Sequence, residues 1–209
     1  MGVPEIKFGS LRAYRYWHLS LDPDGRFPIL MSTYVHMFAG GIIWPHSMPI
    51  KAKCYLDSTH SAPEFGCQCG IYGLKSLLPI GEDGMIRPEV WRIVIRGAVD
   101  LFGKVVYCTD GYRAEYAKVH ALSPLTPCLT CALYDNVLTI VDMRTEGTIL
   151  ILPSVSAGAV LMCPKCAPKY AKEFSQAAGS WELYPVIDMP VLFKELCDRY
   201  CEGRIMVDI

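Results

Sequence analysis

The feature that most constrains this chain is a pair of Cys-x-x-Cys motifs in its C-terminal half. The first is Cys128-Leu-Thr-Cys131 and the second is Cys163-Pro-Lys-Cys166. Each motif closes a tight turn that directs two thiolates at one point, and four thiolates complete the tetrahedral shell of a structural Zn²⁺. Such a site leaves no coordination position open for a substrate. The sequence therefore predicts a zinc site in the C-terminal half with Cys128, Cys131, Cys163 and Cys166 as its ligands.

The composition is that of a folded protein with a substantial core. Of the 209 residues, 52% are hydrophobic and 20% are charged, and the net charge is −1. A chain of this length fits one compact unit with a subdomain, or two small domains. The near-neutral charge does not favour nucleic-acid binding through phosphate neutralisation alone.

No segment has the pattern of a secretory leader or a membrane span. Residues 1–10 contain no continuous apolar run. The apolar stretch over residues 148–162 is interrupted by Pro153 and is shorter than the roughly 20 residues that a span requires. The ten cysteines therefore indicate a reducing, cytoplasmic compartment, where paired cysteines bind metal more often than they form disulfides.

Alternation of apolar and polar residues predicts a mostly-β N-terminal domain over residues 1–122. A first hairpin is expected from strands at residues 8–21 and 27–31, joined by the turn Asp22-Pro-Asp-Gly25. Further strands are expected at residues 50–55, 90–96, 103–107 and 112–117. The last two flank the turn Thr109-Asp-Gly111 and form a second predicted hairpin.

The proline-containing segment 122–127 is the predicted boundary with a second domain over residues 123–209. The elements expected there are a hairpin of residues 137–141 and 148–152, a helix over residues 167–178, and a helix from about Asp188 to Gly203. The order of knuckle, hairpin, second Cys-x-x-Cys and helix resembles a treble-clef zinc finger, whose last ligand pair stands at a helix N-terminus that stabilises thiolates. The predicted fold class is α+β: a mostly-β N-terminal domain, a treble-clef-like zinc-binding hairpin and two C-terminal helices.

A second candidate zinc site consists of the four cysteines of the N-terminal half: Cys54, Cys67, Cys69 and Cys108. His46 and His60 are alternative ligands for this site. The competing interpretation is that Cys54 and Cys108 are ordinary buried cysteines. Cys197 and Cys201 stand four residues apart on the last predicted helix and are expected to be core residues instead of ligands.

Three phrases of the N-terminal half stand out: Leu11-Arg-Ala-Tyr-Arg15, Cys67-Gln-Cys-Gly-Ile-Tyr-Gly-Leu-Lys-Ser76, and Gly103-Lys-Val-Val-Tyr-Cys-Thr-Asp-Gly-Tyr-Arg-Ala-Glu-Tyr-Ala117. They resemble a family of poorly characterised bacterial and bacteriophage proteins that share a Cys-x-Cys-Gly-Ile-Tyr-Ala type motif and a Gly-Tyr-Arg-Ala-Glu motif. The resemblance covers roughly residues 8–120. Members of that family often carry His where this chain has Cys108, an exchange that a zinc ligand tolerates. The resemblance implies a phage or mobile-element context and no particular reaction.

Three functions are consistent with these patterns. The sequence has no Gly-x-Ser-x-Gly elbow, no P-loop and no His-Glu-x-x-His motif. Closed metal sites and near-neutral charge favour a zinc-stabilised binding or regulatory protein whose partner is another protein. The first alternative is a nucleotide-handling enzyme, because the N-terminal half resembles ADP-ribosyltransferase-like folds, in which an aromatic residue and a glutamate hold and activate NAD. Tyr72 and Glu115 would take these roles. The second alternative is a DNA-binding zinc protein.

Overall fold

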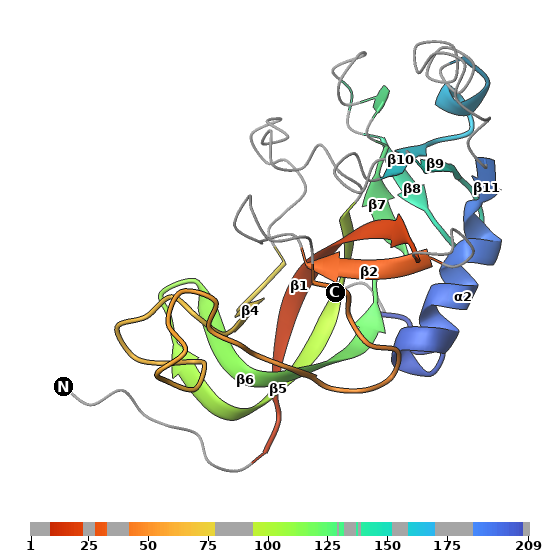
Figure 1. The fold of residues 1–209 in the computed structure, drawn as a ribbon. Coiled ribbons are helices and arrows are strands. Elements are labelled where there is room, and N and C mark those ends of the chain that lie inside the picture. Colours follow the sequence, from red (N-terminus) through yellow and green to blue (C-terminus); the bar gives the residue numbers. More distant parts are fainter. Residues whose placement is uncertain are drawn as a thin grey trace.

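A curved sheet of six strands forms the N-terminal part of the protein (Figure 1). The computed structural model describes residues 9–22, 28–32, 42–77, 94–128, 130–131, 137, 139–151, 159–169 and 186–206. The strands of this sheet are β1 (Leu11–Leu21), β2 (Pro28–Ser32), β3 (Ile50–Lys51), β4 (Ile71–Leu74), β5 (Val94–Tyr107) and β6 (Gly111–Leu122). All of their pairings are antiparallel.

The hydrogen-bonded pairs close four of these strands into a ring. β1 pairs with β5 along one edge and with β2 and β4 along the other. β6 likewise pairs with β5 along one edge and with β4 and β3 along the other. The circuit β1–β5–β6–β4 therefore encloses an interior, and alternate side chains of its strands fill that interior.

Glycine allows β4 to complete the ring. A Cβ at Gly73 would lie 2.7 Å from the Cβ of Ala13 and 3.0 Å from a methyl carbon of Leu101, and both of these residues are fully buried. No side chain fits between β4 and the core at this point. The short strand therefore approaches β1 and β5 closely only because its third residue has no side chain.

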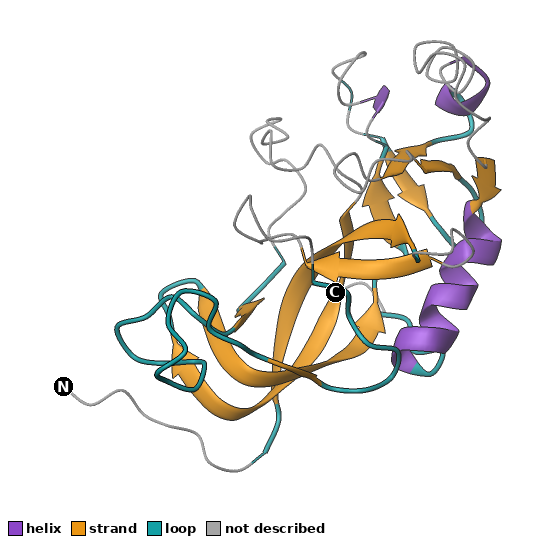
Figure 2. Cartoon of the chain, in the orientation of Figure 1, coloured by secondary structure: helices purple, strands orange, loops and turns teal. Residues whose placement is uncertain are grey.

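The C-terminal part contains two smaller sheets and a helix (Figure 2). Its elements are β7 (Leu125–Pro127), β8 (Ile140–Asp142), β9 (Thr148–Ile151), β10 (Ala159–Met162), β11 (Val186–Asp188) and α2 (Met189–Cys201). β7 pairs with β8, and β9 lies between β10 and β11. The described part of the chain is mostly strand with few helices, as the sequence predicts. None of its helices has the length and apolar character needed to cross a bilayer.

Helix α2 follows the sequence prediction closely. Asp188 is its N-cap, Pro190 stands in its first turn, and Glu202 ends it in the left-handed conformation immediately before Gly203. The buried face carries Met189, Leu192, Phe193, Leu196, Cys197, Tyr200 and Cys201. Cys197 and Cys201 are thus core residues, as expected. This face packs against β6, β2 and β11, which joins the helix to the large sheet.

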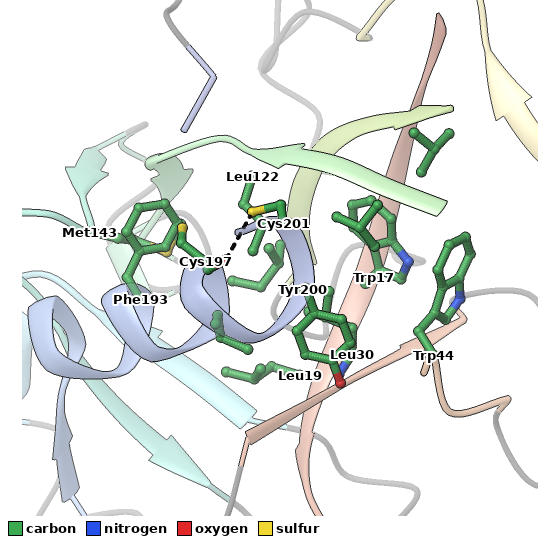
Figure 3. Close-up of a cluster of buried hydrophobic side chains, with 14 of the residues drawn as sticks. Trp17, Leu19, Leu30, Trp44, Leu122, Met143, Phe193, Cys197, Tyr200 and Cys201 are labelled. Carbon is green, nitrogen blue, oxygen red and sulfur yellow. Dashed lines mark hydrogen bonds between the residues drawn. The ribbon is translucent and has the colours of Figure 1, made fainter. Parts of the chain in front are cut away.

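A single buried hydrophobic cluster crosses the predicted boundary at residues 122–127. Figure 3 shows Trp17 and Leu30 of the large sheet near Tyr200 of α2, and Phe193 of α2 next to Met143 at the other end of the cluster. The division into domains 1–122 and 123–209 remains a prediction. The core itself is shared between the two segments.

Two expected strand arrangements are wrong. Residues 94–96 and 103–107, predicted in two separate strands, belong to one strand, β5. Gly103 at φ +76° forms an irregularity in the pairing of this strand with β6 and does not end it. The predicted hairpin of 137–141 and 148–152 does not form, because β8 pairs with β7 while β9 pairs with β10 and β11.

Other expectations are met in part. β1 and β2 form the first expected hairpin, and β5 and β6 form the second, across the turn that precedes Gly111. The strand expected at residues 50–55 is confined to β3. The helix expected over 167–178 is described only to residue 169, and the rest lies outside the described residues. Residues 90–93 and the turn at 23–27 also lie outside them.

We predict that Tyr200→Phe lowers the stability of the whole protein by about 1–3 kcal/mol. The Tyr200 hydroxyl accepts a hydrogen bond from the buried N–H of Leu30 at 3.0 Å, so the substitution leaves that N–H without its partner. Urea unfolding followed by circular dichroism measures the loss. Tyr55→Phe at an exposed position is the control and should leave the midpoint unchanged. Equal midpoints for the two variants would contradict the prediction.

Candidate metal centres

The two Cys-x-x-Cys motifs meet in one buried cluster. The ligand atoms of Cys128, Cys131, Cys163 and Cys166 all lie within 4.8 Å of one another. The Sγ of Cys131 is 3.3 Å from that of Cys166 and 3.6 Å from that of Cys163. All four cysteines are reduced and buried. The structure thus brings together the set of four ligands that the sequence predicts for the first site.

Each motif stands at the end of a strand, where the backbone turns. Cys128 directly follows β7, and Cys163 directly follows β10. Cys166 opens a helical turn over residues 166–169, and its N–H donates to the carbonyl of Cys163 at 3.0 Å. The N–H of Cys163 donates to the Sγ of Cys128 at 3.2 Å, which links the two motifs directly. Backbone donors aimed at sulfur are what a thiolate requires.

The environment affects the four thiols unequally. Burial acts to raise the pKa of Cys163, but hydrogen bonds from the backbone N–H of Cys166, the side chain of Cys131 and the backbone N–H of Lys165 lower it below its ordinary value. Burial raises the pKa of Cys166, and the neighbouring thiols of Cys131 and Cys163 raise it further. Four crowded thiolates would repel one another in this buried space. A bound cation removes that repulsion and allows all four to be deprotonated.

The second cluster lies in the loop between β3 and β4. It consists of Cys54, His60, Cys67 and Cys69, whose ligand atoms also lie within 4.8 Å of one another. The Sγ atoms of Cys54 and Cys67 are 3.7 Å apart, and the Nε2 of His60 is 3.3 Å from the Sγ of Cys69. All four residues are partly exposed, in contrast to the buried C-terminal cluster.

His60 holds the position in this cluster for which the sequence suggested Cys108. Cys108 instead stands in the turn between β5 and β6, where its N–H donates to the carbonyl of Gly111 at 2.9 Å and its Sγ lies 4.0 Å from the carbonyl of Val106. His46, the other alternative ligand, packs edge-on against the ring of Tyr200. Three of the four cysteines proposed for this site thus come together, and the fourth ligand is one of the proposed histidines.

A carboxylate orients His60. The Nδ1 of His60 is 3.4 Å from an Asp57 carboxylate oxygen, so the opposite ring nitrogen faces the cysteines. Hydrogen bonds from the side chain and the backbone N–H of Thr59 lower the pKa of Asp57 and keep it ionised. Metal-bound histidines are commonly held in this way by a carboxylate on the second nitrogen. The sequence gives little sign of this arrangement beyond the short spacing of Asp57 and His60.

Backbone N–H groups also favour the thiolate form of Cys54. Burial acts to raise the pKa of Cys54, but the backbone N–H groups of Asp57 and Leu56 outweigh it and lower the pKa. These donors stand two and three residues after the cysteine. The same spacing separates Cys163 from the N–H groups of Lys165 and Cys166. Cys54 and Cys163 thus both have backbone N–H donors two and three residues after them, although the two loops have different sequences.

Arg113 holds the Cys-x-Cys bend against the sheet. It stands on β6, is only 8% exposed, and donates from Nη1 to the carbonyl oxygens of Cys67 and Cys69. Gly70 has a positive φ of 121°, and a Cβ there would lie 2.9 Å from the Cβ of Pro63 and 3.0 Å from that of Arg113. The Gly-Tyr-Arg-Ala-Glu phrase thus contacts the Cys-x-Cys phrase directly, although about 45 residues separate them in the sequence.

The two residues suggested for nucleotide chemistry have structural partners. The Tyr72 hydroxyl donates to the carbonyl of Gln68 at 2.7 Å, and the Arg113 guanidinium lies over the Tyr72 ring at 6.0 Å. The Glu115 carboxylate accepts the backbone N–H of Lys104 at 3.3 Å and lies 3.6 Å from the Nζ of Lys51. Tyr72 thus joins β4 to the loop before it, and Glu115 joins β6 to β5 and β3.

Comparisons of the chain with protein-family models, with curated proteins and with solved structures found no match.

We predict that Cys163→Ser removes one zinc ion per chain and lowers the Tm. The substitution takes one thiolate from the buried cluster and leaves three others without the cation that neutralises them. Mass spectrometry of bound metal and a thermal melt are the measurements. Lys165→Ala changes an exposed residue of the same motif and should leave both values unchanged. Retention of the full zinc content by Cys163→Ser would contradict the assignment.

We predict that His60→Ala lowers the zinc content by one ion per chain, whereas Cys108→Ser leaves it unchanged. Of these two residues, His60 contributes a ligand atom to the N-terminal cluster and Cys108 does not. Metal analysis of the two purified variants beside the unsubstituted protein decides between them. The reverse pattern would show that the cysteine of the β5–β6 turn is the fourth ligand.

Proposed function

We propose that this chain is a zinc-stabilised binding protein that acts through contact with another protein. Both clusters are closed sets of four ligands rich in cysteine, which is the ligand type and number of structural Zn²⁺ sites. The proposal includes a treble-clef form for the C-terminal site. Its support is that the second cysteine pair follows β10 and opens a helical turn.

The observation that carries the proposal is a group of large exposed side chains beside the N-terminal cluster. We call them the loop surface: Tyr55, Leu56, Phe65 and Tyr72, which are 64%, 70%, 67% and 43% exposed. Each stands within three residues of a cysteine ligand, so a bound metal would fix the backbone that presents them. Exposed apolar groups of this size that are held on a rigid loop are typical of protein-binding surfaces.

The charges near the loop surface favour a protein over a nucleic acid. The Nζ of Lys104 pairs with the carboxylate of Glu64 at 2.8 Å, and the Nζ of Lys51 lies 3.6 Å from the carboxylate of Glu115. Cations that are already paired contribute little to neutralising phosphates. An apolar surface with balanced charge therefore suits a protein partner, and Leu56 in particular has no stacking role with a base.

The proposed function requires a reducing compartment. All ten cysteines are free. Seven of them belong to the two clusters, and Cys108, Cys197 and Cys201 lie outside both. Cysteines remain available as metal ligands in a compartment that keeps them reduced and prevents disulfide formation. The phage or mobile-element context that the sequence resemblance implies agrees with a small regulatory factor of this kind.

We predict that the double substitution Leu56→Ser and Phe65→Ser abolishes partner capture while leaving the zinc content unchanged. Both residues are exposed and neither contributes a ligand atom. The measurement is affinity capture from cells of the native host, followed by mass spectrometry and by direct titration of the protein recovered. Val191→Ser on α2, at a position that is 64% exposed, is the matched control and should retain capture.

Two results would contradict the proposal. One is equal capture by the double variant and the control, because the loop surface would then not be the contact. The other is recovery of nucleic acid whose binding depends on the same two residues. A shift of the Tm on addition of NAD that is lost in Glu115→Gln would instead support a nucleotide-handling enzyme.

A further inference from the structure

We propose that the N-terminal cluster is a thiol-oxidation site, at which a peroxide joins Cys54 and Cys67 in a disulfide and releases zinc while the C-terminal cluster keeps its own. This inference rests on the zinc occupancy included in the proposed function. The two clusters would then differ in their reactivity toward peroxide, although their ligand sets are similar.

Solvent access distinguishes the two clusters. The N-terminal ligands Cys54, Cys67 and Cys69 are all partly exposed, and the His60 side chain is 17% exposed. The cysteines of the C-terminal cluster are 0–6% exposed and belong to the hydrophobic core. Oxidation of cysteine follows thiolate character together with access of the oxidant to sulfur. A dissolved peroxide therefore reaches the first set and not the second.

The distances between the sulfur atoms favour the C-terminal cluster, whereas solvent access favours the N-terminal one. The Sγ atoms of Cys54 and Cys67 are 3.7 Å apart, whereas those of Cys131 and Cys166 are 3.3 Å apart. If closeness alone decided which pair is oxidised, the C-terminal cluster would react first. The proposal states that access outweighs this difference in distance.

The backbone around Cys54 and Cys67 can accommodate the disulfide. Both residues lie between β3 and β4, in a segment whose residues 52–70 are all described and form turns and bends without strand or helix. The two sulfurs must approach from 3.7 Å to the roughly 2 Å of an S–S bond. Cys163 and Cys166, by contrast, are held between the end of β10 and a helical turn.

The reaction balances with a peroxide as the only oxidant. One thiolate attacks the O–O bond of hydrogen peroxide to give a sulfenic acid and hydroxide, and the second thiolate displaces hydroxide from that sulfur. In sum, two thiolates, one hydrogen peroxide and two protons give one disulfide and two water molecules. Zn²⁺ is neither oxidised nor reduced. It leaves because only His60 and Cys69 remain as ligands, and two ligands do not hold it.

The experiment treats the zinc-loaded protein with increasing hydrogen peroxide. A chromogenic chelator follows zinc release, and peptide mapping without reductant identifies the disulfide. The expected result is loss of one of the two zinc ions with a Cys54–Cys67 link, restored by dithiothreitol and added zinc. Cys128, Cys131, Cys163 and Cys166 should stay protected from alkylation throughout.

A variant that keeps four zinc ligands separates oxidation from simple loss of metal. Cys67→His retains a coordinating side chain but removes the thiol that the proposal pairs with Cys54, so its N-terminal zinc should resist the peroxide dose that empties the unsubstituted site. Where Cys67→His does not hold zinc, Cys54→His makes the same comparison. Cys197→Ala, which changes a cysteine outside both clusters, should release zinc as the unsubstituted protein does.

Three results would overturn the inference. They are zinc that stays bound at both sites, zinc that leaves the C-terminal cluster first, and a disulfide that maps to another pair. The zinc content before oxidation separates this failure from failure of the proposed function. A protein that carries no zinc at the N-terminal cluster contradicts both, whereas a zinc-loaded cluster inert to peroxide contradicts the oxidation site alone.

Discussion

The contact on which the N-terminal centre depends is that of the Arg113 guanidinium with the carbonyl oxygens of Cys67 and Cys69. A buried cation needs acceptors, and the bend between these cysteines supplies them directly above β6. The bend leads through Gly70 into β4, the short strand that completes the ring of the large sheet. One side chain thus fixes both the cysteine ligands and the start of the strand that closes the sheet.

The two clusters use similar ligands in different surroundings, and their chemistry follows from those surroundings. In the C-terminal cluster, burial raises the pKa of Cys166 and excludes solvent, so a cation is needed to stabilise the thiolates and is also shielded from exchange. In the N-terminal cluster, a histidine replaces one thiolate, Asp57 orients that histidine, and the sulfurs are partly exposed. The first arrangement suits a permanent structural metal. The second is open to reagents in solution.

Local signals in the sequence were enough for the elements that local contacts determine. Helix α2 begins at Met189, with Asp188 as its N-cap and Pro190 in its first turn, and ends before Gly203. These signals can be read from the sequence because caps and proline act within one turn of the chain. The failed hairpin of residues 137–152 depended on distant partners, since β8 pairs with β7 and not with its neighbour in sequence. The fourth member of the N-terminal cluster also depends on distant contacts, and the sequence left Cys108, His46 and His60 as candidates for it. Nothing in the spacing of Cys108 and His60 shows which of two turns faces the Cys-x-Cys bend.

The shared core determines how much of the fold the loss of a metal ion from each cluster would disturb. Cys128, Cys131, Cys163 and Cys166 are members of the same buried cluster as Trp17 and Tyr200, so unpaired thiolates there would disturb packing that reaches the large sheet. Cys54 and Cys69 only pack against the edge of that cluster. Release of metal from the N-terminal loop therefore changes the loop and the exposed side chains that it carries, while the core retains its contacts. The proposed oxidation would therefore alter the loop surface without unfolding the protein, because the cluster proposed to react is not the one that belongs to the core.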